Sequence, residues 1–157
     1  MSKLASTILC ACGEHFVASY LSGMGLVVAF TRRGNPATDM IVTSELGGRS
    51  VSLQVKAGGV HSHITRKRKP ENNAWAWRTG SKAAENASEF HWYAFVYVGD
   101  WPKGGGLPEV LFVPSRIVAQ KARDPEIVEG WFWISQAEAE QYAGLKGFEK
   151  LAKALAR

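Results

Sequence analysis

Three side chains in the first sixty residues have the types and spacing that metal-assisted hydrolysis needs. Asp39 opens one short apolar run, and Gln54 and Lys56 flank a valine in the next run. Strand alternation puts Gln54 and Lys56 on the same face. A carboxylate and an amide supply oxygen ligands for a divalent cation, and a neighbouring ammonium can orient a water. These three residues are therefore candidate catalytic residues.

The expected local elements would bring the three side chains to one end of a β-hairpin. Residues 39–44 and 50–56 are predicted strands, and the two glycines between them, Gly47 and Gly48, supply the positive φ angles of a hairpin turn. In such a hairpin the start of the first strand lies beside the end of the second. Asp39 should therefore lie close to Lys56.

A fourth candidate, Glu14, lies in an expected helix over residues 6–21. Helical spacing puts Glu14 on one face with Cys10, Val17 and Leu21, whose side chains are apolar or only weakly polar. A carboxylate facing the core is costly to desolvate unless a cation or hydrogen-bond donors satisfy it. A metal ion at the end of the hairpin would do so.

The rest of the sequence predicts an α/β domain that spans all 157 residues. The pattern predicts further strands over 26–30, 92–98 and 110–113, and helices over 81–89, 115–122 and 136–157. Gly144 and Gly147 are expected to interrupt the last helix, and no element is assigned over residues 61–79. This order of elements predicts a mixed central sheet flanked by helices.

These residues together carry a resemblance. Residues 13–18 (Gly-Glu-His-Phe-Val-Ala), then Asp39, then Gln54-Val55-Lys56, resemble the PD-(D/E)XK nuclease superfamily of restriction endonucleases and Holliday-junction resolvases. Gln54 stands where the family has a second acid, a variant similar to Mrr-type enzymes. The resemblance implies a restriction endonuclease-like αβββαβ core over about residues 6–113, with 114–157 as a C-terminal helical extension.

The resemblance also implies an activity, namely that of a Mg²⁺-dependent endonuclease that hydrolyses phosphodiester bonds of nucleic acid. DNA is the expected substrate, and Mn²⁺ could replace Mg²⁺. Glu14, Asp39, Gln54 and the carbonyl of Val55 would bind the metal, and Lys56 would orient the attacking water. Gln54 removes one negative charge from the family's set, which Glu14 would restore.

Other interpretations stay open. Each candidate residue also has an interpretation that involves no function. Asp39 would be a turn residue, Gln54 and Lys56 would lie on a solvated strand face, and Glu14 would lie at the surface. The chain could also be a nucleic-acid-binding module on a nuclease-like fold whose catalysis is weak or lost. A protein-partner role, such as an immunity or toxin component, would show neither cleavage nor salt-dependent binding of nucleic acid.

A basic segment directly follows the proposed site and is expected to contact nucleic-acid phosphates. Its residues are His61, His63, Arg66, Lys67, Arg68 and Lys69. The alternative is a solvated loop. A net charge of +5 and a pI of about 9.4 suit a polyanionic partner.

Two further features bear on location and assembly. No apolar run reaches transmembrane length, and the chain start lacks a signal peptide, so we expect a cytoplasmic protein without a membrane partner. Cys10 and Cys12 are expected to be small buried thiols. Trp131-Phe132-Trp133 is expected in the core or at a strand edge. If exposed, this segment would serve as a homodimer contact, as in relatives that cut both strands.

Overall fold

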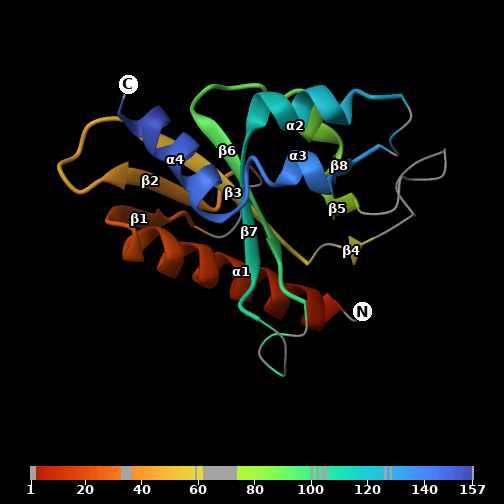
Figure 1. Ribbon diagram of the computed structural model, residues 1–157, viewed down its shortest axis with the longest axis horizontal. Coiled ribbons are helices and arrows are strands. Elements are labelled where there is room, and N and C mark those ends of the chain that lie inside the picture. Colours follow the sequence, from red (N-terminus) through yellow and green to blue (C-terminus); the bar gives the residue numbers. More distant parts are fainter. Residues whose placement is uncertain are drawn as a thin grey trace.

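A mixed five-stranded sheet forms the centre of the computed structural model (Figure 1). The strand order is β1-β2-β3-β6-β7, in which β3 and β6 run parallel and every other neighbouring pair is antiparallel. The bounds are β1 (Leu26–Phe30), β2 (Met40–Ser44), β3 (Ser50–Gly58), β6 (His91–Tyr97) and β7 (Glu109–Pro114). The structure describes residues 3–32, 37–58, 60–61, 74–99, 101, 103, 106–125, 127 and 129–156.

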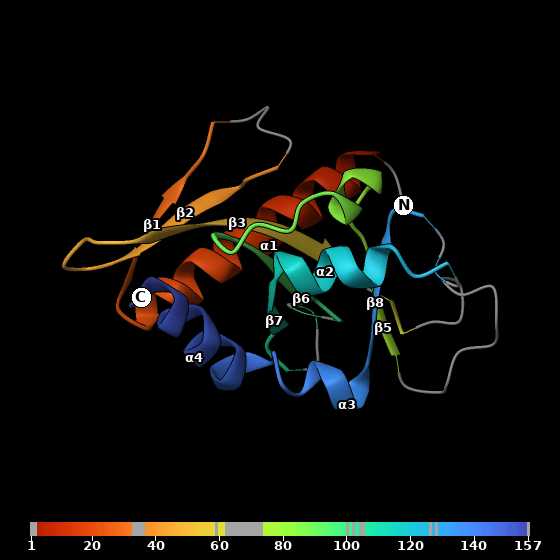
Figure 2. The same ribbon diagram turned by 90° about the horizontal axis from the view of Figure 1, so that it is seen from above.

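Within the described ranges, a smaller sheet and four α-helices surround this central sheet. The smaller sheet has the order β4-β5-β8, with β4 (Val60–His61), β5 (Ala74–Arg78) and β8 (Trp131–Ser135). The helices are α1 (Lys3–Gly23), α2 (Ser115–Ala122), α3 (Gln136–Ala139) and α4 (Gly144–Leu155), with a 3₁₀ turn η1 (Ser81–Ala84). Figure 2 shows β1 and β2 at one edge of the molecule, away from α2 and α3.

Strand alternation divides the interior into two cores, one on each face of the central sheet. On one face, Leu53 and Val55 of β3 pack with Val17 of α1 and Leu151 of α4. On the other face, Phe95 of β6 packs with residues of α2, β5 and β8. The face of β3 that carries Gln54 and Lys56 is therefore turned toward the smaller sheet, because Gln54 pairs with Tyr93 and Lys56 with Phe95.

The predicted fold class is confirmed: the chain is α/β, with a mixed central sheet flanked by helices. The strand over 26–30 and the helix over 115–122 have the predicted bounds, and the remaining central strands differ by one or two residues. The helix predicted over 6–21 is longer, extending from Lys3 to Gly23.

The helix predicted over 81–89 is wrong, because only the 3₁₀ turn over 81–84 forms. The polar side chain of Ser88 bonds locally instead: its hydroxyl accepts a hydrogen bond from the Phe90 N–H at 3.2 Å. The Ser88 carbonyl accepts another from the Ser115 hydroxyl. Such side-chain bonds compete with a helix.

The interruption predicted at Gly147 is also wrong, because Gly147 lies inside α4. A Cβ there would meet the Tyr142 carbonyl, so this glycine permits close packing rather than a break. Gly144, with φ of 48°, does mark the helix start.

Strand β5 of the smaller sheet lies in residues 61–79, to which no element was assigned. β5 reads Ala-Trp-Ala-Trp-Arg, and its first four residues are all buried. Strand β8 contains Trp131-Phe132-Trp133, of which Phe132 is fully buried and Trp133 nearly so. Phe132 and Trp133 therefore lie in the core, as predicted, whereas Trp131 is half-buried on an edge strand of the smaller sheet. The homodimer contact stays a prediction. Among the described residues, no helix is long and apolar enough to cross a bilayer.

Candidate active site

A pocket of about 390 Å³ lies where the first half of α1 meets the end of β3 and the smaller sheet. Glu14, Asp39 and Lys56 all line it, together with Val55 and Cys10. The structure thus brings three of the four predicted catalytic residues to one cavity. We refer to it as the α1–β3 pocket.

Asp39 is fixed at this pocket by the edge of the sheet. Its backbone extends the β2 ladder, since its N–H donates to the Leu53 carbonyl and its carbonyl accepts from the Thr31 N–H, both at 2.9 Å. After Leu53, β3 no longer pairs with β2. The Asp39 carboxylate takes that place, because its Oδ2 accepts a hydrogen bond from the Val55 N–H at 2.7 Å. Its Oδ1 forms no hydrogen bond to a described residue.

Lys56 is close enough to Asp39 for the two charges to act on each other. Burial raises the pKa of the Asp39 carboxyl, while the Val55 N–H and the charge of Lys56 oppose that rise. Burial lowers the pKa of the Lys56 ammonium, while Asp39 and Cys10 act in the opposite direction. Within the described chain no ion pair joins Asp39 to Lys56. The Asp39 carboxylate and the Lys56 ammonium, both partly desolvated, therefore line one cavity without forming an ion pair with each other.

Glu14 reaches the pocket because α1 packs closely against the end of β3. The glycine before it, Gly13, is buried, and a Cβ at that position would lie 2.4 Å from the Ala57 Cβ. The negative charge of Glu14 affects the pKa of the Cys10 thiol, which lines the same pocket. Burial raises the pKa of the Cys10 thiol, Glu14 and Asp39 add to the rise, and Lys56 opposes it. The helix-face argument for Glu14 thus led to the right position.

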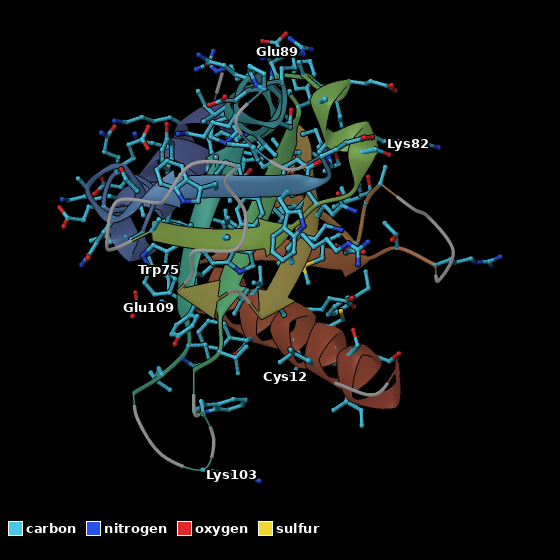
Figure 3. All side chains as sticks on the ribbon, turned by 90° about the vertical axis from the view of Figure 1, so that its right-hand side faces the viewer. Cys12, Trp75, Lys82, Glu89, Lys103 and Glu109 are labelled. Atoms are coloured by element: carbon cyan, nitrogen blue, oxygen red, sulfur yellow. The ribbon has the colours of Figure 1, made fainter. Side chains whose placement is uncertain are left out.

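The prediction of buried thiols is wrong. Cys10 is exposed and Cys12 is half-buried, and both are free cysteines. Cys10 lines the α1–β3 pocket, which leaves its side chain open to solvent. Figure 3 shows Cys12 on α1, at the side of the molecule where this helix runs.

Gln54 occupies a different position from the other three candidates. It lies on the same face of β3 as Lys56, as alternation predicts, and its side chain is 7% exposed. In the described part of the chain, Gln54 is not among the residues that line the pocket. The carboxylates of Glu14 and Asp39 are therefore the acidic oxygen donors at the cavity.

The same face of β3 carries a polar contact nearer the start of the strand, at Ser52. The Ser52 hydroxyl lies 2.8 Å from Nδ1 of His91 on β6. Burial lowers the pKa of His91 to about 4, and the charge of Lys56 adds to that effect. His91 is therefore a neutral, buried imidazole at neutral pH.

The small sheet supplies a wall of the pocket that the sequence did not predict. Trp77 and Arg78 of β5 and Trp131 of β8 line it, and Arg78 is exposed. Arg78 adds a second cation to the cavity that already holds Lys56. The alternation of alanine and tryptophan over residues 74–77 was the available signal for this strand.

Most of the predicted nucleic-acid-binding segment lies outside the described residues. His63, Arg66, Lys67, Arg68 and Lys69 fall in that range. The structure describes the backbone of His61, in β4, and nothing more of the segment.

The donors at the pocket suit a hard divalent cation. Glu14 and Asp39 line the pocket and carry carboxylate oxygens, and Val55, whose carbonyl is the predicted third ligand, lines it as well. Among the described residues no cluster of three or more His, Cys, Asp or Glu side chains forms. Mg²⁺ is commonly held by one or two carboxylates, with waters and substrate phosphate completing its shell. A two-carboxylate site beside a pocket of this size therefore fits Mg²⁺ and does not resemble a closed structural metal site.

Comparisons with known proteins give no family for this chain. No protein-family model matches it, and no curated protein sequence matches it significantly.

Proposed function

We propose that this protein is a Mg²⁺-dependent endonuclease with a restriction endonuclease-like core, acting on DNA through Glu14, Asp39 and Lys56. The observation that carries the proposal is the convergence of these three side chains on the α1–β3 pocket. They come from α1, the start of β2 and the end of β3, elements that lie far apart in sequence.

In this account each residue has a distinct role. Glu14 and Asp39 would hold the cation, with the Val55 carbonyl completing the protein's ligands. The bound cation would polarise a phosphodiester and lower the pKa of a coordinated water. Lys56 would orient the attacking water and offset charge that develops on the phosphate. Arg78 would attract the phosphate backbone at the pocket entrance.

The hydrogen bond from Val55 to Asp39 supports this assignment. It fixes Oδ2 at the edge of the sheet, while Oδ1 accepts no hydrogen bond from the described residues and would be open to a cation. The partial burial of Asp39 also favours a cation, since a desolvated carboxylate lacks the water that would otherwise stabilise its charge.

A second candidate is a nucleic-acid-binding module that does not cleave. It is favoured by one observation: Gln54, at the family's second acidic position, does not line the pocket within the described chain. Cations at the pocket would then hold nucleic acid without a metal-activated water.

Cleavage of supercoiled plasmid separates the two candidates. The purified protein would be incubated with plasmid in Mg²⁺, in Mn²⁺ and in EDTA, alongside Lys56→Ala and the control Lys82→Ala, an exposed lysine on η1 (Figure 3). We expect nicking with either metal, none in EDTA, and loss only with Lys56→Ala. If duplex, branched and single-stranded substrates are bound with salt-dependent affinity but not cut, the binding module is the right account.

A further inference from the structure

A second pocket, of about 280 Å³, lies at the other end of the central sheet, where β6 begins and β7 ends. Four cationic side chains line it, together with one carboxylate, Glu89. The cations are Arg49, Arg116, Lys150 and Lys153. Figure 3 shows Glu89 at the opposite end of the molecule from Cys12 on α1, so this basic pocket is separate from the α1–β3 pocket.

The four cations come from three separate parts of the chain. Arg49 lies in the turn between β2 and β3, Arg116 in the first turn of α2, and Lys150 and Lys153 on α4. None of them forms an ion pair with a described carboxylate. Like charges gathered around one cavity repel each other, and a multiply charged anion would relieve that repulsion.

Aromatic side chains share the pocket with these cations. The Phe90 ring is 44% exposed, and the Arg49 guanidinium carbon lies 5.8 Å from its centre. The Lys150 ammonium lies 4.5 Å from the centre of the Tyr142 ring. An exposed aromatic ring beside cations is the arrangement on which nucleic-acid bases stack while their phosphates are held.

We propose that the basic pocket binds a nucleoside phosphate, with its phosphate among the four cations and its base against Phe90. The volume is close to the lower end of small-molecule sites, which is about 300 Å³, and suits a mononucleotide. Charge-assisted bonds from arginine and lysine are the strong contacts to phosphate. The ligand is either a free nucleotide or the 5′-phosphorylated end of a strand. The inference is independent of the proposed nuclease activity.

Titration calorimetry with the full chain tests the inference. The probes are adenosine 5′-monophosphate, adenosine, inorganic phosphate, and a short oligonucleotide with and without a 5′-phosphate. We expect the monophosphate to bind at least tenfold more tightly than adenosine or phosphate alone. A tighter complex with the 5′-phosphorylated strand than with its 5′-hydroxyl form identifies a strand end as ligand. Equal binding of the two strands identifies the free nucleotide.

Matched variants locate the binding. The double variant Arg116→Ala, Lys153→Ala should weaken binding of the monophosphate at least tenfold. The control Lys146→Ala removes an exposed lysine from the same helix as Lys153 that does not line the pocket, and should leave binding unchanged. Lys56→Ala should also leave it unchanged, so failure of the nuclease proposal is distinguishable. Absence of binding to the folded wild type, or full binding by the double variant, would overturn the inference.

Discussion

The Asp39 carboxylate accepts a hydrogen bond of 2.7 Å from the backbone N–H of Val55, on the strand that carries Lys56. This bond replaces a missing strand partner, because β2 begins only at Met40. The Asp39 side chain thus completes the hydrogen bonding at the edge of the sheet and is at the same time a candidate metal ligand.

The charges of Asp39 and Lys56 should be energetically coupled. The double variant Asp39→Asn, Lys56→Met removes both partly desolvated charges, whereas each single variant leaves the opposite charge without its compensation. A double-mutant cycle by urea unfolding should give a coupling free energy on the order of 1 kcal/mol. The double variant should be more stable than the sum of the single effects predicts. Strict additivity would show that the two charges do not interact.

Close packing of α1 on β3 should make Gly13 intolerant of a side chain. Gly13→Ala would put a Cβ 2.4 Å from the Ala57 Cβ, so the helix must move, at a cost of about 1–3 kcal/mol. Gly23→Ala, near the end of the same helix, meets nothing within 4 Å and should be neutral or stabilising. Thermal unfolding measures both.

A second substitution, at Ala57, tests whether the close contact causes the loss of stability in Gly13→Ala. Ala57→Gly removes the group that the new Cβ would meet, so the pair Gly13→Ala, Ala57→Gly should regain stability beyond additivity. Because Glu14 follows Gly13, the single variant Gly13→Ala should also lose cleavage. If Gly13→Ala unfolds at the same temperature as wild type, the close approach is wrong.

Protonation of His91 should weaken the fold at mildly acidic pH. Its pKa is lowered from 6.5 to about 4 in the folded chain, so the unfolded chain binds the proton more tightly. Stability from this group is therefore present above pH 6.5 and is lost as pH falls toward about 4. The slope within that window is up to about 1.4 kcal/mol per pH unit.

Urea unfolding at several pH values measures this slope. His91→Gln retains a polar group near Ser52 and removes the titration, so its stability should fall less steeply over the same range. Parallel pH profiles for wild type and variant would exclude His91 as the cause.

Arg78 should act on substrate binding more than on chemistry. It is exposed at the edge of the α1–β3 pocket, where it would meet a phosphate before Lys56 does. Arg78→Ala should raise KM for cleavage several-fold and reduce the salt dependence of binding, with a smaller effect on kcat. Lys82→Ala is the control. An unchanged KM would remove Arg78 from the site.

Much of the architecture followed from local sequence signals. The five central strands have dense apolar patterns, and two glycines mark the β2–β3 turn, so periodicity predicted them. Alternation on β3 and helical spacing on α1 were enough to place Lys56 and Glu14 near one cavity. The hairpin and the alternation on β3 are local geometry, whereas the position of Glu14 at the pocket also depends on the packing of α1 against β3.

The remaining features depend on long-range packing. Strand β5 pairs with β8, which lies about fifty to sixty residues further along the chain, and the sequence of β5 does not reveal that partner. Arg78 was therefore missed together with its strand. The basic pocket was missed for the same reason, since Arg49, Arg116 and Lys153 lie on three elements that only the tertiary fold brings together.

Metal binding at Glu14 and Asp39 is the central claim, and a crystal soaked in Mn²⁺ tests it most directly. The account predicts an anomalous-scattering peak in the α1–β3 pocket, about 2 Å from a carboxylate oxygen of each residue, close to the coordination distance of Mg²⁺. Lys56 would lie beside the peak without touching it, and the peak would vanish in an Asp39→Asn crystal. A saturated crystal with no peak there, or with Glu14 turned away from the cavity, would contradict the account.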